Sequence, residues 1–246
     1  MAPTALRLLS LAFLGLATSC SSSYVLPGDK ADLQVFTSSD IQAGFAAQAT
    51  NPWPASIAIV RVQDPSYRHQ GYGRFQPKQD TGRYSVVFAK EADEDTQVGK
   101  LNDLDQIHGV VSMNRLLLPK TLKSDEELRL AASRLQADLL LIYTFDTDFY
   151  NSDAAVPLTV VTLGLAPTRL ISTATTCSAL LMDTRTGYLY SVYESTERTE
   201  ATSTTWGSHE SADRERRRTE ERAFASLVDE MVLSWPRVLE RHSSRE

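Results

Sequence analysis

The chain has 246 residues, of which 42% are hydrophobic and 23% are charged, so it can bury a sizeable core like an ordinary globular protein. Its 25 basic and 31 acidic residues give a net charge of −6, which argues against nucleic-acid binding, because that needs clustered excess Lys and Arg. The two cysteines, Cys20 and Cys177, are too few for a disulfide scaffold and lie in no metal-ligand spacing. We therefore expect no nucleic-acid partner, no metal and no cofactor.

The first nineteen residues have the three parts of a secretory leader. Arg7 gives the start a positive charge, residues 8–17 (LLSLAFLGLA) are apolar, and the small residues Thr18 and Ser19 follow. Ten apolar residues are too few to span a bilayer, which takes about 20. This pattern is typical of a signal peptide, which we assign to residues 1–19.

The cysteine that follows these small residues makes the leader resemble that of a bacterial lipoprotein. In that class the peptide is cleaved before the cysteine, and the new N-terminal cysteine is diacylated on sulfur and often acylated on its amino group, with chains such as palmitate. The resemblance implies lipidation of Cys20, although Ala17 stands where the family usually has Leu, and Leu16 lies one place earlier. Plain secretion with an incidental cysteine, or a retained helix, are the alternatives.

The residues after Cys20 indicate where in the cell envelope the protein is held. Residues 20–38 contain SSS and Pro27-Gly28 and few core-type residues, so we predict a lipidated tether. Two or three acyl chains anchor a protein stably without spanning the bilayer. Ser21 stands where enterobacterial inner-membrane lipoproteins usually have Asp, so the resemblance favours the periplasmic side of the outer membrane over the inner membrane.

Residues 39–246 are predicted to form one domain, and its elements follow from apolar periodicity and turn residues. We predict helices over 39–49, 98–106, 125–136 and a long C-terminal segment, and strands over 56–62, 109–118, 139–145, 170–182 and 188–196; residues 83–89 fit a strand or a helix start. Ser124 and Glu127 form a capping box before the third of these helices. Pro236 should kink or end the last helix. The order predicts an α/β (α+β) fold: a single mixed or mostly antiparallel sheet with helices packed on it.

From about residue 56 to residue 235 this order resembles the superfamily of periplasmic lipoproteins that includes CsgG, LpoB and the TolB N-terminal domain. Three segments carry the resemblance: SIAIVRV (56–62), LQADLLLIYTF (135–145) and CSALLMDTRTGYLYSV (177–192). Members act as binding modules, pore subunits or activators, and as a rule are not enzymes. The resemblance therefore implies a non-catalytic role.

The acidic residues and histidines of the chain are the candidates for catalytic or metal-binding groups. Asp146 and Asp148 lie two apart after a strand, so they share one face and are candidates for the paired carboxylates of a glycosidase; a solvated strand end is the alternative. The four histidines match no metal motif. Residues 91–95 (EADED) lack calcium-loop spacing and fit a solvated loop.

Two further segments have more than one interpretation. Residues 154–171 carry one charge, Arg169, and could form a buried connection, an oligomer contact or a membrane-inserting hairpin. The run RERRR at 214–218 could contact anionic lipid or an acidic partner, but glutamates at helical spacing favour a self-paired solvated face.

The sequence thus predicts a lipid-anchored cell-envelope protein that acts as a non-catalytic binding or assembly module. Its expected partners are the membrane, through the anchor, and a protein partner or a second copy. The alternatives are a subunit of an envelope secretion pore, or a cell-wall hydrolase that uses Asp146 and Asp148.

Overall fold

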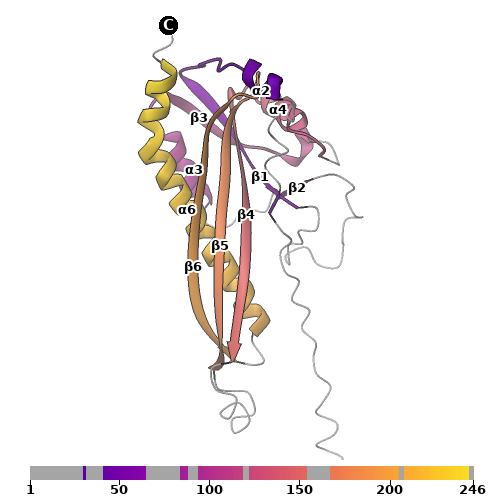
Figure 1. Ribbon diagram of the computed structural model, residues 1–246, viewed down its shortest axis with the longest axis vertical. Coiled ribbons are helices and arrows are strands. Elements are labelled where there is room, and N and C mark those ends of the chain that lie inside the picture. The colour runs from indigo at the N-terminus through magenta and orange to yellow at the C-terminus, as the bar shows by residue number, and fades with distance from the viewer. Residues whose placement is uncertain are drawn as a thin grey trace, which may run out of the picture.

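The computed structural model describes residues 30–31, 41–64, 84–87, 94–118, 122–153, 167–204 and 208–243 (Figure 1). These residues form one mixed six-stranded sheet and four α-helices, which confirms the predicted fold class. The helices are α2 (Ile41–Ala46), α3 (Glu94–Asn102), α4 (Asp125–Arg134) and α6 (Ser208–Ser243), with a 3-10 turn at Arg115–Leu117. The strands are β1 (Ala55–Gln63), β2 (Ser85–Val87), β3 (Ile107–Ser112), β4 (Leu139–Asp153), β5 (Pro167–Asp183) and β6 (Leu189–Thr204).

The sheet has the order β2-β1-β4-β5-β6, and β3 also pairs with β1. β1 is parallel to β3 and β4, whereas β1–β2, β4–β5 and β5–β6 are antiparallel. β3 and β2 share the outer edge of β1, since β3 pairs with Ala55–Ile59 and β2 with Arg61–Gln63. A gap in pairing therefore falls at Val60.

Three long antiparallel strands extend the sheet beyond β1. The β1–β4 ladder stops at Tyr143, but β4 stays paired with β5 as far as Asp153. Ten further residues of strand reach about 33 Å, and in Figure 1 β4, β5 and β6 run side by side away from the other strands. This extension exceeds the strands predicted at 139–145, 170–182 and 188–196.

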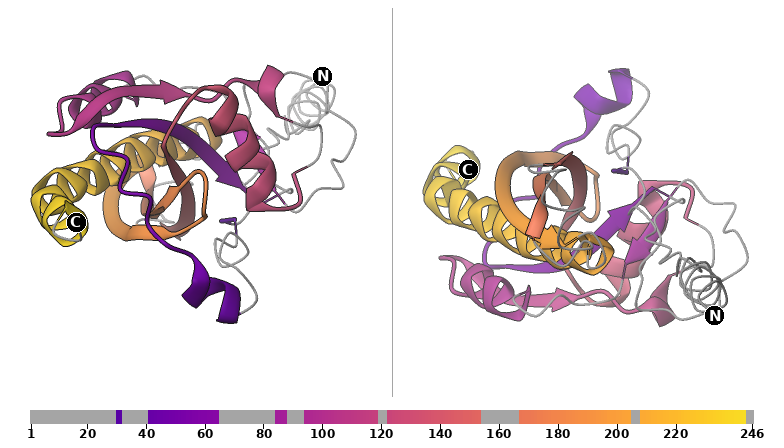
Figure 2. Two further views of the ribbon diagram at one scale, coloured as in Figure 1. Left: turned by 90° about the horizontal axis from the view of Figure 1, so that it is seen from above. Right: turned by 90° about the horizontal axis from the view of Figure 1, so that it is seen from below.

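The first hydrophobic core lies between the sheet and α6, with α3 beside it. Phe224, Leu227, Val228, Met231 and Trp235 of α6 are buried there, as the sequence pattern predicts. Figure 2 shows α6 lying across the curled strands. Pro236 was predicted to kink or end the helix. The predicted end is wrong, because α6 continues past Pro236 to Ser243.

A second core covers the opposite face of the sheet, beneath α4. Leu128, Ala131 and Ala132 of α4 pack on the apolar side chains of β1, β4 and β5. α4 begins at Asp125 as predicted, but the reciprocal capping box is not formed: Ser124 makes no side-chain cap bond, and Glu127 accepts from the Lys123 N–H at 2.6 Å.

Two local predictions before α4 need correction. Glu94 and Asp95 begin α3, so the acidic run at 91–95 is not wholly a loop. β3 ends at Ser112, and a 3-10 turn replaces the second half of the strand predicted at 109–118. Residues 154–166, most of the weakly charged segment, lie outside the described residues.

Candidate functional site

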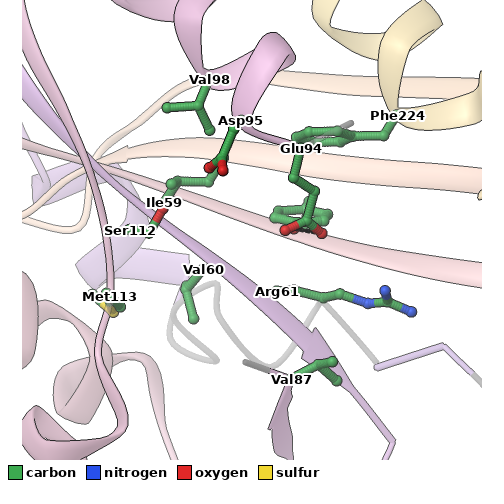
Figure 3. A pocket seen from close by; sticks show the side chains of 11 residues that line it. Ile59, Val60, Arg61, Val87, Glu94, Asp95, Val98, Ser112, Met113 and Phe224 are labelled. Atoms are coloured by element: carbon green, nitrogen blue, oxygen red, sulfur yellow. Dashed lines mark hydrogen bonds between the residues drawn. The ribbon is translucent and has the colours of Figure 1, made fainter. Parts of the chain in front are cut away.

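The gap in pairing at the outer edge of β1 leaves a small hollow (Figure 3). Its floor is β1 at Ile59, Val60 and Arg61, and the start of α3 supplies Glu94 and Asp95. Its volume is about 60 Å³, well below the 300–1,000 Å³ usual for ligand pockets. It has room for a few water molecules or for the tip of one side chain.

Arg61, at the edge of this hollow, belongs to a buried ion network with α6. Its Nη2 donates to Glu220 Oε2 at 3.1 Å, and Arg216 Nη1 lies 2.7 Å from the same oxygen. The side chains of all three residues are at most 3% exposed. The Arg61 guanidinium also lies 4.5 Å from the centre of the Phe145 ring, a cation–π distance. Cations from the sheet and from the helix thus share one carboxylate, and Arg216 also contacts Asp213 Oδ1 at 3.1 Å.

Glu94 gives the hollow a second polar contact, which is partly buried. The Tyr143 hydroxyl donates to Glu94 Oε1 at 2.8 Å. Burial, and then the negative charge of Glu94, raise the pKa of Tyr143 well above its ordinary value. Tyr143 therefore stays a neutral hydrogen-bond donor and cannot serve as a base near neutral pH.

The chemistry of the hollow follows from its size and charge. Two acidic side chains at the start of α3 line the hollow beside Arg61, which shares Glu220 with Arg216. A hollow of this size is too small for an ordinary organic ligand.

The arginine-rich run at 214–218 is only partly a solvated face. Arg217 pairs with Asp213 at 3.0 Å near the surface, as predicted for a self-paired helix. Arg216, however, is 3% exposed and points toward the sheet, and Glu215 is also buried. The prediction of full solvation is wrong for these two, because β1 supplies Arg61 as a third member of the buried network.

The turn at 183–187 contains a buried carboxylate that the sequence pattern did not single out. Asp183 accepts from the Thr50 N–H at 3.0 Å and from the Thr50 hydroxyl at 2.5 Å, and also from the N–H groups of Arg185 and Thr186. Burial opposes its ionisation, but these hydrogen bonds outweigh burial and hold the pKa of Asp183 below its ordinary value. The Tyr190 hydroxyl donates to it at 3.2 Å. Through these hydrogen bonds Asp183 links the segment before β1 to the β5–β6 hairpin.

The carboxylates proposed for hydrolysis lie elsewhere, on the extension of β4. Asp146 is half-buried and 3.5 Å from Lys30 Nζ, while Asp148 is exposed. Neither lines the hollow at β1. Their partners on β5 are Thr176 and Ala174, so among the described residues no acid or base faces them across that ladder.

The other candidate groups are separate from one another. Within the described parts of the chain no three His, Cys, Asp or Glu side chains are grouped to hold a metal ion. His108 is exposed, and His242 is buried against Tyr188 and Tyr190. Cys177 is a free buried cysteine, and burial raises the pKa of its thiol.

Cys20 and the signal peptide lie outside the described residues, so the lipidation site stays a prediction. Of the helices that the structure describes, none has the length and hydrophobicity needed to cross a bilayer.

Comparison with known proteins gives little further information. No family model matches the sequence, and no curated protein matches it. One solved structure to which the chain is similar is protein XCC0632 from Xanthomonas campestris, described as DUF330. The identity is 15% and the TM-score 0.35, over 78% of this chain and 93% of that chain. A likeness at that level does not establish a shared fold or function.

Proposed function

We propose that this protein is a lipid-anchored component of the bacterial cell envelope, held on the periplasmic side of the outer membrane. Its α/β domain binds a protein partner or a second copy of itself and carries no catalysis. The observation that carries the proposal is the leader of residues 1–19 followed directly by Cys20. Cys177 supports it, because a thiol buried in the first core is not placed to pair with a cysteine in a tether.

The non-catalytic part of the proposal is supported by the hollow at β1 and by the β4 carboxylates. The hollow has about a fifth of the volume of the smallest usual ligand pockets. Asp146 lies 3.5 Å from Lys30, and neither it nor Asp148 lines the hollow. The resemblance of residues 56–235 to the CsgG, LpoB and TolB N-terminal superfamily is kept as part of this proposal.

The anchor is tested on protein extracted from membranes of a lipoprotein-processing bacterium. Peptide mass spectrometry should find an N-terminal peptide that begins at Cys20 and carries acyl groups. Cys20→Ser should release the chain from the membrane fraction. Finding Met1 intact, or a cleaved chain with an unmodified N-terminus elsewhere, would contradict the proposal.

The binding role is tested by crosslinking intact envelopes and identifying what co-purifies with the protein. A specific protein partner, or a dimer of this chain, supports a binding module. A ring-sized particle in detergent would instead support the secretion-pore alternative. Release of glycan fragments that Asp146→Asn abolishes would support the hydrolase alternative.

A further inference from the structure

The chain makes an ordered contact with the sheet only ten residues after Cys20. Ala31 is 2% exposed and belongs to the second core, and its N–H donates to the Thr144 hydroxyl of β4 at 3.0 Å. The Thr144 hydroxyl in turn donates to Gln63 Oε1 at 3.1 Å. A buried polar chain therefore connects this early segment to the end of β1.

Gln63 holds the Thr144 hydroxyl in place by extending the β1–β4 ladder with its side chain. Its Oε1 accepts from the Phe145 N–H at 2.8 Å, and its Nε2 donates to the Phe145 carbonyl at 3.0 Å. Both ends of the amide are thus fixed, which orients the Thr144 hydroxyl toward Ala31. The acceptor for Ala31 is built from β1 and β4 and does not depend on the tether.

Lys30 adds an ion pair at the edge of this contact. Its Nζ lies 3.5 Å from Asp146 Oδ2, with 54% and 38% of the two side chains exposed. A pair this exposed contributes little by itself, so the buried bond of Ala31 dominates. We call Lys30, Ala31, Thr144 and Asp146 together the clasp.

We infer that the clasp fixes the tether on the outer face of β4, so that the acylated Cys20 holds this face of the sheet toward the lipid bilayer. The inference rests on the proposed lipidation. Ten residues from Cys20 to Lys30 span at most about 36 Å when fully extended. With the clasp open, the chain is still held at Gln48, whose carbonyl accepts from the Thr186 hydroxyl. The segment from Cys20 to Gln48 could then extend to about 100 Å.

The clasp also decides which surface faces the bilayer. Side chains alternate along β4, so Thr144, Asp146 and Asp148 share the outer face, whereas α6 covers the other. A sheet and a packed helix together are about 20 Å thick, so turning α6 toward the bilayer would use more than half of the tether's full reach. The exposed side of α6, which carries Glu230, therefore points away from the membrane.

The outer face should stand near the bilayer without adsorbing to it. Asp148, Glu194 and Glu200 are exposed there, and they outnumber the cations of the same face, Lys30 and Arg198. Carboxylates are repelled by the anionic lipids of a membrane surface. The clasp, rather than attraction to headgroups, is what holds this face in position.

The test measures energy transfer from a fluorophore on the lipidated protein to acceptor lipids in liposomes. Asp148→Cys and Glu230→Cys place one dye on either side of the molecule, since Cys177 is buried and Cys20 is acylated. Transfer should be stronger from position 148 than from position 230. Raising the salt concentration should leave this difference unchanged.

Ala31→Asp opens the clasp, because it would bury a carboxylate in the second core and shift the equilibrium about a hundredfold. It should abolish the difference between the two positions. Ala46→Asp, the same substitution at an exposed alanine of α2, should preserve it. Thr144→Val, which removes only the buried hydroxyl, should weaken the clasp about tenfold and serves if the first variant does not fold.

Equal transfer from both positions in acylated, liposome-bound protein would overturn the clasp and leave the proposed anchor intact. A chain that is not acylated and does not sediment with liposomes would overturn the anchor itself. These two failures are therefore distinguishable in one preparation.

Discussion

Replacing Glu220 should destabilise the domain more than any other single charge change on α6. Glu220→Gln removes the anion that the buried side chains of Arg61 and Arg216 share, although Arg216 keeps its contact with Asp213 at 3.1 Å. Removing one partner of a buried ion pair costs about 3–5 kcal/mol. Typical domains have free energies of unfolding of about 5–15 kcal/mol, so the variant should lose about a fifth of its stability or more.

The assay is urea unfolding followed by tryptophan fluorescence, because Trp53 and Trp235 contact each other in the first core at a 5.6 Å ring separation. The expected loss corresponds to a fall in Tm of about 6–20 °C for a domain of this size. The matched control is Glu230→Gln on the exposed side of the same helix, which should change stability by less than about 0.5 kcal/mol.

The same reasoning predicts a rescue. The triple variant Arg61→Met, Arg216→Met, Glu220→Leu removes all three charges and keeps the volume, so its stability should return to near or above that of the original chain. If Glu220→Gln lowers the free energy of unfolding by less than about 1 kcal/mol, as little as the control does, water reaches these groups. That result would refute the buried network. Failure of the triple variant to recover would show that the network is needed for correct packing.

Three further outcomes are expected. Asp183→Asn should cost about 2–3 kcal/mol at pH 7. Because the folded-state pKa of Asp183 is lowered, its ionised form stabilises the fold above about pH 3.9, and this stabilisation is lost as the pH falls through the folded-state pKa. Urea unfolding from pH 7 down to pH 3 should therefore show the stabilities of the two proteins converging. Native membrane-extracted protein should react with no thiol reagent and unfolded protein with one equivalent, because Cys177 is buried and Cys20 is acylated; two equivalents would contradict this. Gly187→Ala should lower the free energy of unfolding by about 1 kcal/mol, measured by thermal melting, because the residue has φ +74°; an unchanged Tm would show that the turn relaxes freely.

The elements that local patterns specify were predictable from the sequence. β1 and α4 have clear periodicity, and the turn that ends in Gly187 joins the strands as predicted. The positions of the core residues on α6 also follow from their helical spacing.

The extension of β4, β5 and β6 was underestimated because it has little hydrophobic alternation. Beyond Phe145, its inner face carries polar side chains such as Thr147, Thr175 and Thr199, and the first two bond to each other at 3.0 Å. Strand structure there comes from pairing between residues that range from Asp146 with Thr176 to Asp153 with Arg169, and a local window does not contain that information.

The buried charges were missed for a related reason. A run such as RERRR resembles a solvated helix face, and burial of Arg216 depends on Arg61 and Glu220, which are 159 residues apart in sequence. Pro236 likewise stays inside α6 because tertiary contacts outweigh its local cost of about 3 kcal/mol. Trp235 donates from Nε1 to the Asp105 carbonyl at 2.8 Å, and Val238 is buried in the core.

The central claim, a domain anchored through Cys20, is tested most directly by the mass of the N-terminal peptide from membrane-extracted protein. The account predicts a peptide that begins at Cys20 with two or three acyl chains, and loss of membrane association in Cys20→Ser. A peptide that begins at Met1, or that contains Cys20 without a lipid, would contradict it.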